Sequence, residues 1–226
     1  MELCINCEVA EVIEKYMDLY PLDGVTCNPN MISRLNDPDF FGAIKKIRKV
    51  VGDKKLFVQV TSPIPEKMVE EAYLIREAVG DDTIIKIPAN EMGMKAIKLL
   101  NAKGIKTLGT VVHTASQGIL ALQAGADYIA PFWSYMLDDD IDAYEEVSKM
   151  ATYKHNNGIE GKILVACTMT NKQFSEAIEA GADAITINPD YLSSLLVVKQ
   201  ADYFMDLFIT SWDSVYGEGK TILDLK

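Results

Sequence analysis

The chain alternates short runs of β-branched and other apolar residues with longer stretches in which apolar residues recur every three or four positions. Eight of the short runs predict strands, at residues 3–6, 24–26, 56–60, 83–87, 106–110, 128–130, 162–166 and 184–187. The longer stretches predict helices, among them residues 66–78, 91–102, 115–124 and 172–180. Strict alternation of this kind predicts a parallel sheet, because parallel strands need long crossovers between them.

A short sequence recurs where predicted helices lead into strands. It reads Ala-Gly-Ala-Asp at 124–127 and again at 180–183, and a glycine just past a helix relieves the left-handed turn there. Eight such units close most simply into a barrel, and 226 residues is near the ~250 typical of that fold. We therefore expect an α/β protein with one domain over residues 1–226, a (β/α)8 TIM barrel. An open doubly wound sheet is the alternative, although no Gly-x-Gly-x-x-Gly sequence follows a predicted strand.

One more helix is predicted at residues 201–216, after the eighth unit. Its apolar side is formed by Phe204, Leu207, Phe208, Trp212 and Val215. An apolar stripe of this size is unfavourable in water, so we expect it to pack on the barrel or on a neighbouring subunit.

Charge and composition exclude several classes of protein. The formal net charge of −11 argues against binding to nucleic acids or anionic membranes. No apolar stretch approaches the ~18 residues that a membrane span needs. The N-terminus lacks the basic region of a signal peptide, so we expect a cytoplasmic protein.

Cys4 and Cys7 have the spacing of a redox or metal pair. They fall in or next to the first predicted strand, where the two side chains would point to opposite faces. A thiol redox protein therefore stays only as an alternative.

Lys86 is the one amine in an apolar strand-like run that Pro88 closes. Burial disfavours the charged form of a lysine and lowers its pKa. A neutral amine is a nucleophile that can form a Schiff base with a carbonyl compound. The alternative is a lysine whose head reaches from the strand end into water.

The chemistry of a β/α barrel lies at the C-terminal ends of its strands. The side chains expected there are mostly uncharged amides and hydroxyls. They are Asn6, Thr26, Asn28, Gln59, Thr61, Lys86, Thr110, His113, Phe132, Trp133, Cys167, Thr168 and Asn188. This set suits a hydroxylated, neutral substrate such as a ketose, and it lacks the dense His, Cys and carboxylate ligands of a metal site.

Several motifs follow one another in an order that resembles the transaldolase family. They are Gly24-Val25-Thr26-Cys27-Asn28-Pro29, Ile85-Lys86-Ile87-Pro88, Leu108-Gly109-Thr110 with Ser116-Gln117-Gly118, and Ala130-Pro131-Phe132. The resemblance covers essentially the whole chain and is closest to the small members, the fructose-6-phosphate aldolases and short transaldolases.

The resemblance implies a Schiff-base enzyme that cleaves or forms the C3–C4 bond of a ketose while Lys86 holds a dihydroxyacetone unit. Aldolases of the family release that unit, whereas transaldolases pass it to an aldehyde acceptor. No metal or organic cofactor is implied, because the iminium itself withdraws the electrons. Ring-stacked decamers formed through the C-terminal helix are also implied.

Roles for single residues follow from the same resemblance. Gln59 and Thr110 match positions that hold a water serving as the base, and Thr26 and Asn28 match positions that bind the dihydroxyacetone hydroxyls. Two alternatives stay open on general grounds: Asn28 suits a turn, and Thr110 could cap the next helix.

The chain departs from the family pattern at the chemical centre. Asn6 stands where the family has an aspartate, and an amide cannot take up a proton. Phe132 matches the transaldolases but Gln59 matches the aldolases, so the choice between transfer and release stays open. These departures also leave room for a catalytically weak, sugar-binding relative.

The phosphate end of the pattern differs as well. Tyr135 replaces an arginine, Cys167 a serine and Met169 a basic residue. We therefore expect a substrate without phosphate, in an uncharged pocket that Trp133 and Tyr135 shape. His113 is a possible additional proton carrier, because imidazole suits that task near neutral pH.

Overall fold

The structure, a computed structural model, describes residues 1–225. Its first compact unit, Met1–Pro189, is a closed barrel in which each strand pairs in parallel with the next and the last pairs with the first. The strands are β1 (Glu2–Asn6), β2 (Gly24–Thr26), β3 (Lys55–Gln59), β4 (Ile84–Pro88), β5 (Thr107–Val112), β6 (Tyr128–Pro131), β7 (Lys162–Ala166) and β8 (Ala184–Ile187). The predicted (β/α)8 barrel is confirmed, and the open sheet is wrong.

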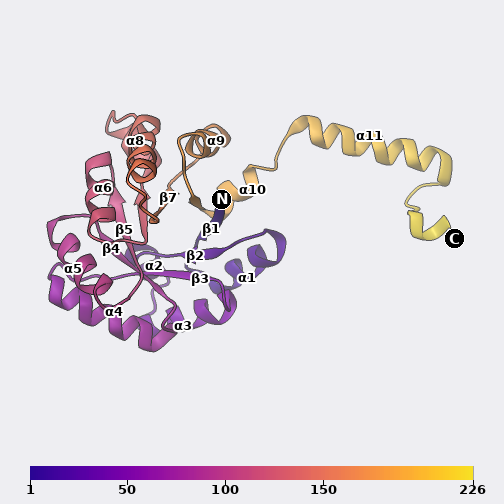
Figure 1. The fold of residues 1–226 in the computed structure, drawn as a ribbon. Coiled ribbons are helices and arrows are strands. Elements are labelled where there is room, and N and C mark those ends of the chain that lie inside the picture. The colour runs from indigo at the N-terminus through magenta and orange to yellow at the C-terminus, as the bar shows by residue number, and fades with distance from the viewer. Residues whose placement is uncertain (226) are drawn as a thin grey trace. The chain divides into compact units, whose positions relative to one another are not determined.

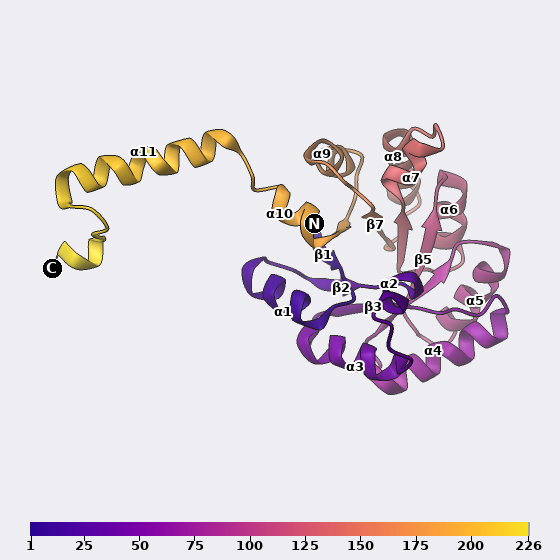
Figure 2. The same cartoon turned by 180° about the vertical axis from the view of Figure 1, so that it is seen from behind.

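Helices surround the strands of this unit, as two opposite views show (Figure 1, Figure 2). They are α1 (Ala10–Leu19), α2 (Pro29–Arg34), α3 (Phe40–Val51), α4 (Pro65–Val79), α5 (Glu91–Asn101), α6 (Ala115–Gln123), α7 (Trp133–Asp138), α8 (Ala143–Asn156) and α9 (Asn171–Glu179). Side-chain caps fix where several of them begin. Asn90 caps α5, Thr170 caps α9, and Thr114 forms a capping box with Gln117 on α6.

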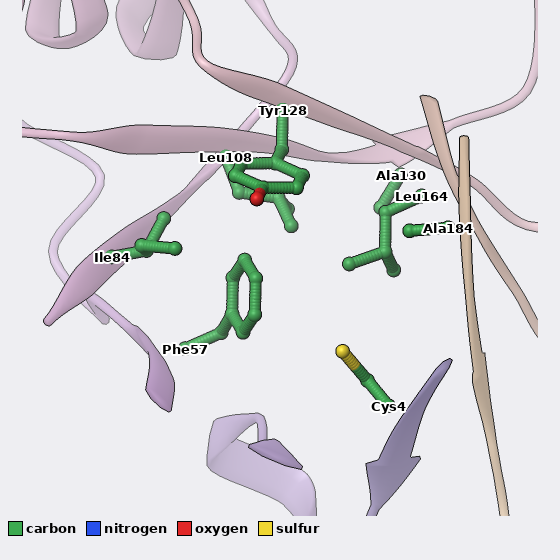
Figure 3. Close-up of a cluster of buried hydrophobic side chains, with 8 residues drawn as sticks. All are labelled: Cys4, Phe57, Ile84, Leu108, Tyr128, Ala130, Leu164 and Ala184. Atoms are coloured by element: carbon green, nitrogen blue, oxygen red, sulfur yellow. The ribbon is translucent and has the colours of Figure 1, made fainter. Parts of the chain in front are cut away.

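The barrel interior is filled from alternate strand positions. Cys4, Phe57, Ile84, Leu108, Tyr128, Ala130, Leu164 and Ala184 form one buried cluster there (Figure 3). The rings of Phe57 and Tyr128 meet edge to face with centroids 5.2 Å apart. Side chains two positions further along each strand face the same way. This alternation turns the polar layer at the C-terminal strand ends toward the barrel axis.

The chain from Asp190 onward forms a second compact unit. The helix α10 (Pro189–Ser194) leads into it, and α11 (Lys199–Tyr216) and a short 3-10 helix (Ile222–Leu225) follow. The predicted helix at 201–216 is confirmed, with a start two residues earlier. None of its residues is buried by the rest of this unit, and Phe208 is 60% exposed. What this apolar side packs against stays a prediction.

No helix within residues 1–225 is both long enough and apolar enough to cross a bilayer.

Candidate active site

Lys86 lies in the middle of β4, two residues beyond the interior residue Ile84. Its side chain faces the barrel interior on the alternation argument, and the residue is only 6% exposed. Burial lowers the pKa of its amine below the ordinary 10.5, although nearby Cys27 and Cys167 oppose the shift. The amine is therefore held in a dry place, and the alternative of a head reaching into water is wrong.

A directional hydrogen-bond chain joins the ends of three neighbouring strands, β8, β2 and β1. The Thr26 hydroxyl donates to Asn6 Oδ1 at 2.9 Å, and it lies 2.7 Å from the hydroxyl of Thr186. Asn6 Nδ2 in turn donates to Asn188 Oδ1 at 3.0 Å. Because Thr26 gives its proton to Asn6, Thr186 must be the donor toward Thr26. This series of hydrogen bonds fixes the side chains of Asn6 and Thr26 in place.

Thr186 was missed by the sequence reasoning, which stopped at Asn188. The signal was present, since Ala184, Thr186 and Asn188 follow the period of two that places side chains on one face of a strand.

Gln59 and Thr110 lie on the strands to either side of Lys86. Gln59 is directly beside Lys86 in the β3–β4 register, and Thr110 is beside Pro88 in the β4–β5 register. Thr110 is fully buried and its hydroxyl has no hydrogen-bond partner among the described residues. Thr114 caps the following helix, so the alternative that Thr110 is the cap is wrong. A buried hydroxyl without a partner is uncommon, and Thr110 combines it with a place at the C-terminal end of the strand next to that of Lys86.

Asn28 caps α2, where its Oδ1 accepts from the backbone N–H of Met31 at 3.0 Å. The side-chain oxygen therefore has a structural role, as a helix cap rather than in the turn of the alternative. The amide nitrogen of the same side chain still offers two N–H donors.

Aromatic rings follow one another at the end of β6. The Phe132 ring lies 6.0 Å from that of Tyr135 and 5.8 Å from that of His113. Tyr135 is 47% exposed, whereas Trp133 is 1% exposed and its indole N–H has no partner among residues 1–225. Trp133 was expected to shape the pocket together with Tyr135. The first turn of α7 turns Trp133 into the protein, and its part in shaping the pocket stays a prediction.

The loop after β7 is tied to the start of α7. Gln173 Oε1 accepts from the backbone N–H of Met169 at 2.7 Å and from the Ser134 hydroxyl at 3.2 Å. Sequence reasoning missed Gln173, and no motif pointed to it. Cys167 is half-buried at the strand end, and burial raises the pKa of its thiol to about 11. Lys172 points outward and pairs with Glu176, so it adds no charge to the site.

The Cys4 and Cys7 thiols are both free and buried. Burial raises the pKa of Cys4 to about 12 and raises that of Cys7 as well. A redox pair needs a low-pKa, accessible thiol, so the redox alternative is wrong.

The site therefore combines a desolvated amine with uncharged hydrogen-bonding groups at the C-terminal ends of the barrel strands. The sequence matches the family described as transaldolase/fructose-6-phosphate aldolase over residues 6–211. The chain belongs to this family. It is an enzyme of the aldolase or transaldolase type, as the family implies.

A relative in Streptococcus pneumoniae (strain ATCC 700669 / Spain 23F-1), named "Probable fructose-6-phosphate aldolase", is similar along almost its entire length. The two chains are 33% identical over 213 residues, which cover 94% of this chain and 96% of that protein. Among solved structures, one described as "Native KDPGal structure" has a similar fold, with a TM-score of 0.59 over 83% of this chain and 82% of that chain. Its sequence identity is 16%, so this likeness concerns the fold alone.

Proposed function

We propose that this family member is a class I aldolase or transaldolase whose Lys86 forms a Schiff base with the keto group of a ketose. The observation that carries the proposal is the buried amine of Lys86, whose pKa is lowered by desolvation. A lysine that is neutral near pH 7 can attack a carbonyl, whereas the ammonium form cannot.

The reaction then follows from the neighbours of Lys86. Loss of water from the first adduct gives an iminium, which withdraws electrons from the bond between the third and fourth carbons of the ketose. Cleavage also requires a base for the hydroxyl proton on the fourth carbon, a contribution of about 10²–10⁴ in rate. We assign that proton to a water held by Gln59 and Thr110.

The dihydroxyacetone unit stays on Lys86 after cleavage. We assign the binding of its hydroxyl groups to the Asn28 amide and to the remaining acceptor site of the Thr26 hydroxyl. Asn6 already donates to Asn188 and accepts from Thr26, so it orients this side of the site and takes up no proton. Because Asn6 cannot act as a base, the water between Gln59 and Thr110 carries the proton transfer.

Incubation of the protein with dihydroxyacetone and D-glyceraldehyde tests the proposed function. We expect a ketose, detected by chromatography, at a rate that a metal chelator does not change. Loss of the rate with the chelator would contradict Schiff-base chemistry, and the absence of a ketose would favour a sugar-binding relative. Supplying a ketose with and without an added aldehyde then separates transfer from release.

The pH dependence of Schiff-base formation is the first specific prediction. Because burial lowers the pKa of Lys86, the neutral amine persists as the pH falls below the ordinary 10.5. The rate constant for trapping dihydroxyacetone should therefore stay nearly constant just below that pH. For an exposed lysine, the neutral fraction falls about tenfold for each unit by which the pH drops below 10.5. If the rate constant for trapping fell tenfold per pH unit from pH 10.5 downward, Lys86 would behave as an ordinary lysine.

We propose a substrate without phosphate, because Tyr135, Cys167 and Met169 bring no cation to the acceptor end. Tyr135→Arg should raise kcat/KM for fructose 6-phosphate at least about tenfold, since a charge-assisted hydrogen bond contributes about 1.5–3 kcal/mol. Steady-state kinetics with fructose and its 6-phosphate measures the change. A micromolar KM of the parent for the phosphate ester, unaltered in Tyr135→Ala, would contradict the proposal.

We also propose that the chain forms a homo-oligomer, a decamer, through α11. The apolar side of this helix, which the second unit by itself leaves unburied, supports an interface between copies. Native mass spectrometry gives the number of subunits directly.

A further inference from the structure

The strand β5 contains one residue more than its neighbour β6. Gly109 pairs with Ile129 and Val112 with Pro131, so β5 advances three residues where β6 advances two. Val111 has a φ of +62°, in a region that β-branched residues seldom adopt. It is therefore the extra residue of a β-bulge, a feature that often re-aims a side chain next to an active site.

The bulge decides which side chain after Thr110 faces the barrel mouth. In a regular strand, Val112 would follow Leu108 and Thr110 toward the axis. With the extra residue, Val112 comes opposite Pro131. The next residue on each strand, His113 and Phe132, then faces the opposite way, toward the axis. Phe132 packs against the interior cluster, and the two rings lie 5.8 Å apart. His113 therefore shares the inward side of the mouth with Phe132.

The backbone beneath the imidazole is fixed. The N–H groups of His113 and Thr114 both donate to Gln117 Oε1, at 2.9 and 3.2 Å. No side chain within residues 1–225 forms a hydrogen bond with the imidazole nitrogens. A half-buried ring on a fixed backbone, with both nitrogens unengaged, is a ready partner for a polar ligand.

We propose that His113 is a specificity residue that hydrogen-bonds a hydroxyl group of the acceptor aldehyde, and that the acceptor is an uncharged hydroxyaldehyde. This inference rests on the proposed Schiff-base function. The row of rings from His113 through Phe132 to Tyr135 forms an apolar wall with polar edges at the barrel mouth. Such a wall orients a short polyhydroxylated chain by a few hydrogen bonds, and the net charge of −11 disfavours an anion.

The test compares two acceptors that differ in hydroxyl groups, D-glyceraldehyde and propanal, each added to dihydroxyacetone. His113→Phe keeps a ring against Phe132 but removes the nitrogens. We expect its kcat/KM to fall about tenfold for glyceraldehyde and less than twofold for propanal, as for the loss of one hydrogen bond. His113→Asn, which restores a donor and an acceptor, should recover most of the loss.

Equal losses for the two acceptors, or no loss for either, would overturn the role of His113. His155→Ala is the matched control, because the second histidine of the chain is exposed near the end of α8 and should leave both rates unchanged. Borohydride trapping of dihydroxyacetone separates the two claims. A His113→Phe protein that traps normally keeps the Schiff-base function intact, whereas a parent protein that never traps fails at the proposed function itself.

Deletion of Val111 tests the bulge independently. Without the extra residue, Val112 follows Thr110 directly and stays opposite Pro131. Regular alternation then keeps His113 on the inward side, so the preference for glyceraldehyde over propanal should be kept. Val111→Gly tolerates the left-handed backbone and should keep that preference. Loss of the preference in Val111→Gly, with Lys86 still trapped, would show that the valine side chain and not the bulge is responsible.

Discussion

Replacement of Lys86 with methionine should lower kcat by at least about 10⁴-fold and remove all covalent trapping of dihydroxyacetone. Methionine fills a similar volume but has no nucleophilic atom, so the iminium cannot form. Activity is followed as ketose formation from dihydroxyacetone and D-glyceraldehyde. The effect is the largest that we expect from any single substitution, because every later step needs the covalent intermediate.

Stability measurements separate this loss from unfolding. The amine of Lys86 is buried without a carboxylate partner among the described residues, so its removal should not lower Tm. Lys98→Met on the exposed side of α5 is the matched control, with activity expected within about twofold of the parent. A Lys86→Met protein that retains more than about a hundredth of the parent activity would place the chemistry elsewhere.

Replacement of Thr110 with valine should lower kcat about 10²-fold or more while leaving Tm within a few degrees of the parent. Valine has the shape of threonine, and the Thr110 hydroxyl has no partner in the described chain, so no internal hydrogen bond is lost. What valine cannot do is hold the water that takes the hydroxyl proton. The measurements are kcat from initial rates and Tm from a thermal melt.

Thr107→Val on the same strand is the control for this prediction. Thr107 is equally buried and its hydroxyl is also unpartnered, but it lies at the N-terminal end of β5, away from the chemistry. It should match or exceed the parent Tm and keep full activity. Equal losses of activity in the two variants would mean that packing of the strand, and not the water, is responsible.

The water is shared if Gln59 and Thr110 act through it together. Gln59→Leu should then lower kcat about as much as Thr110→Val does. The kcat of the double variant should be only slightly lower than that of either single variant. Residues that act as one unit are not additive, whereas independent residues multiply their effects.

The fold was predictable because it depends on the spacing of apolar residues, which can be read directly from the sequence. The eight apolar runs became eight strands, and the buried Lys86 followed from an amine placed among β-branched neighbours. The alternation from Cys4 to Asn6 and from Phe57 to Gln59 also carried the polar side chains to one layer.

The predictions failed where local geometry breaks that alternation. The bulge at Val111 is invisible in the sequence, because Val111 and Val112 look alike and the extra residue is defined only by pairing with β6. Trp133 lies two residues past the end of β6, and the helix that begins there turns its side chain into the protein. Gln173 forms one hydrogen bond to the loop after β7 and one to the first turn of α7, which no local motif predicts.

The central claim is that the Lys86 amine condenses with the keto group of a sugar. Borohydride reduction in the presence of dihydroxyacetone, followed by intact-mass and peptide mass spectrometry, measures this most directly. We predict a single stable adduct per chain, on the peptide that contains Lys86. An unmodified chain, or an adduct on an exposed lysine while Lys86 stays free, would contradict it.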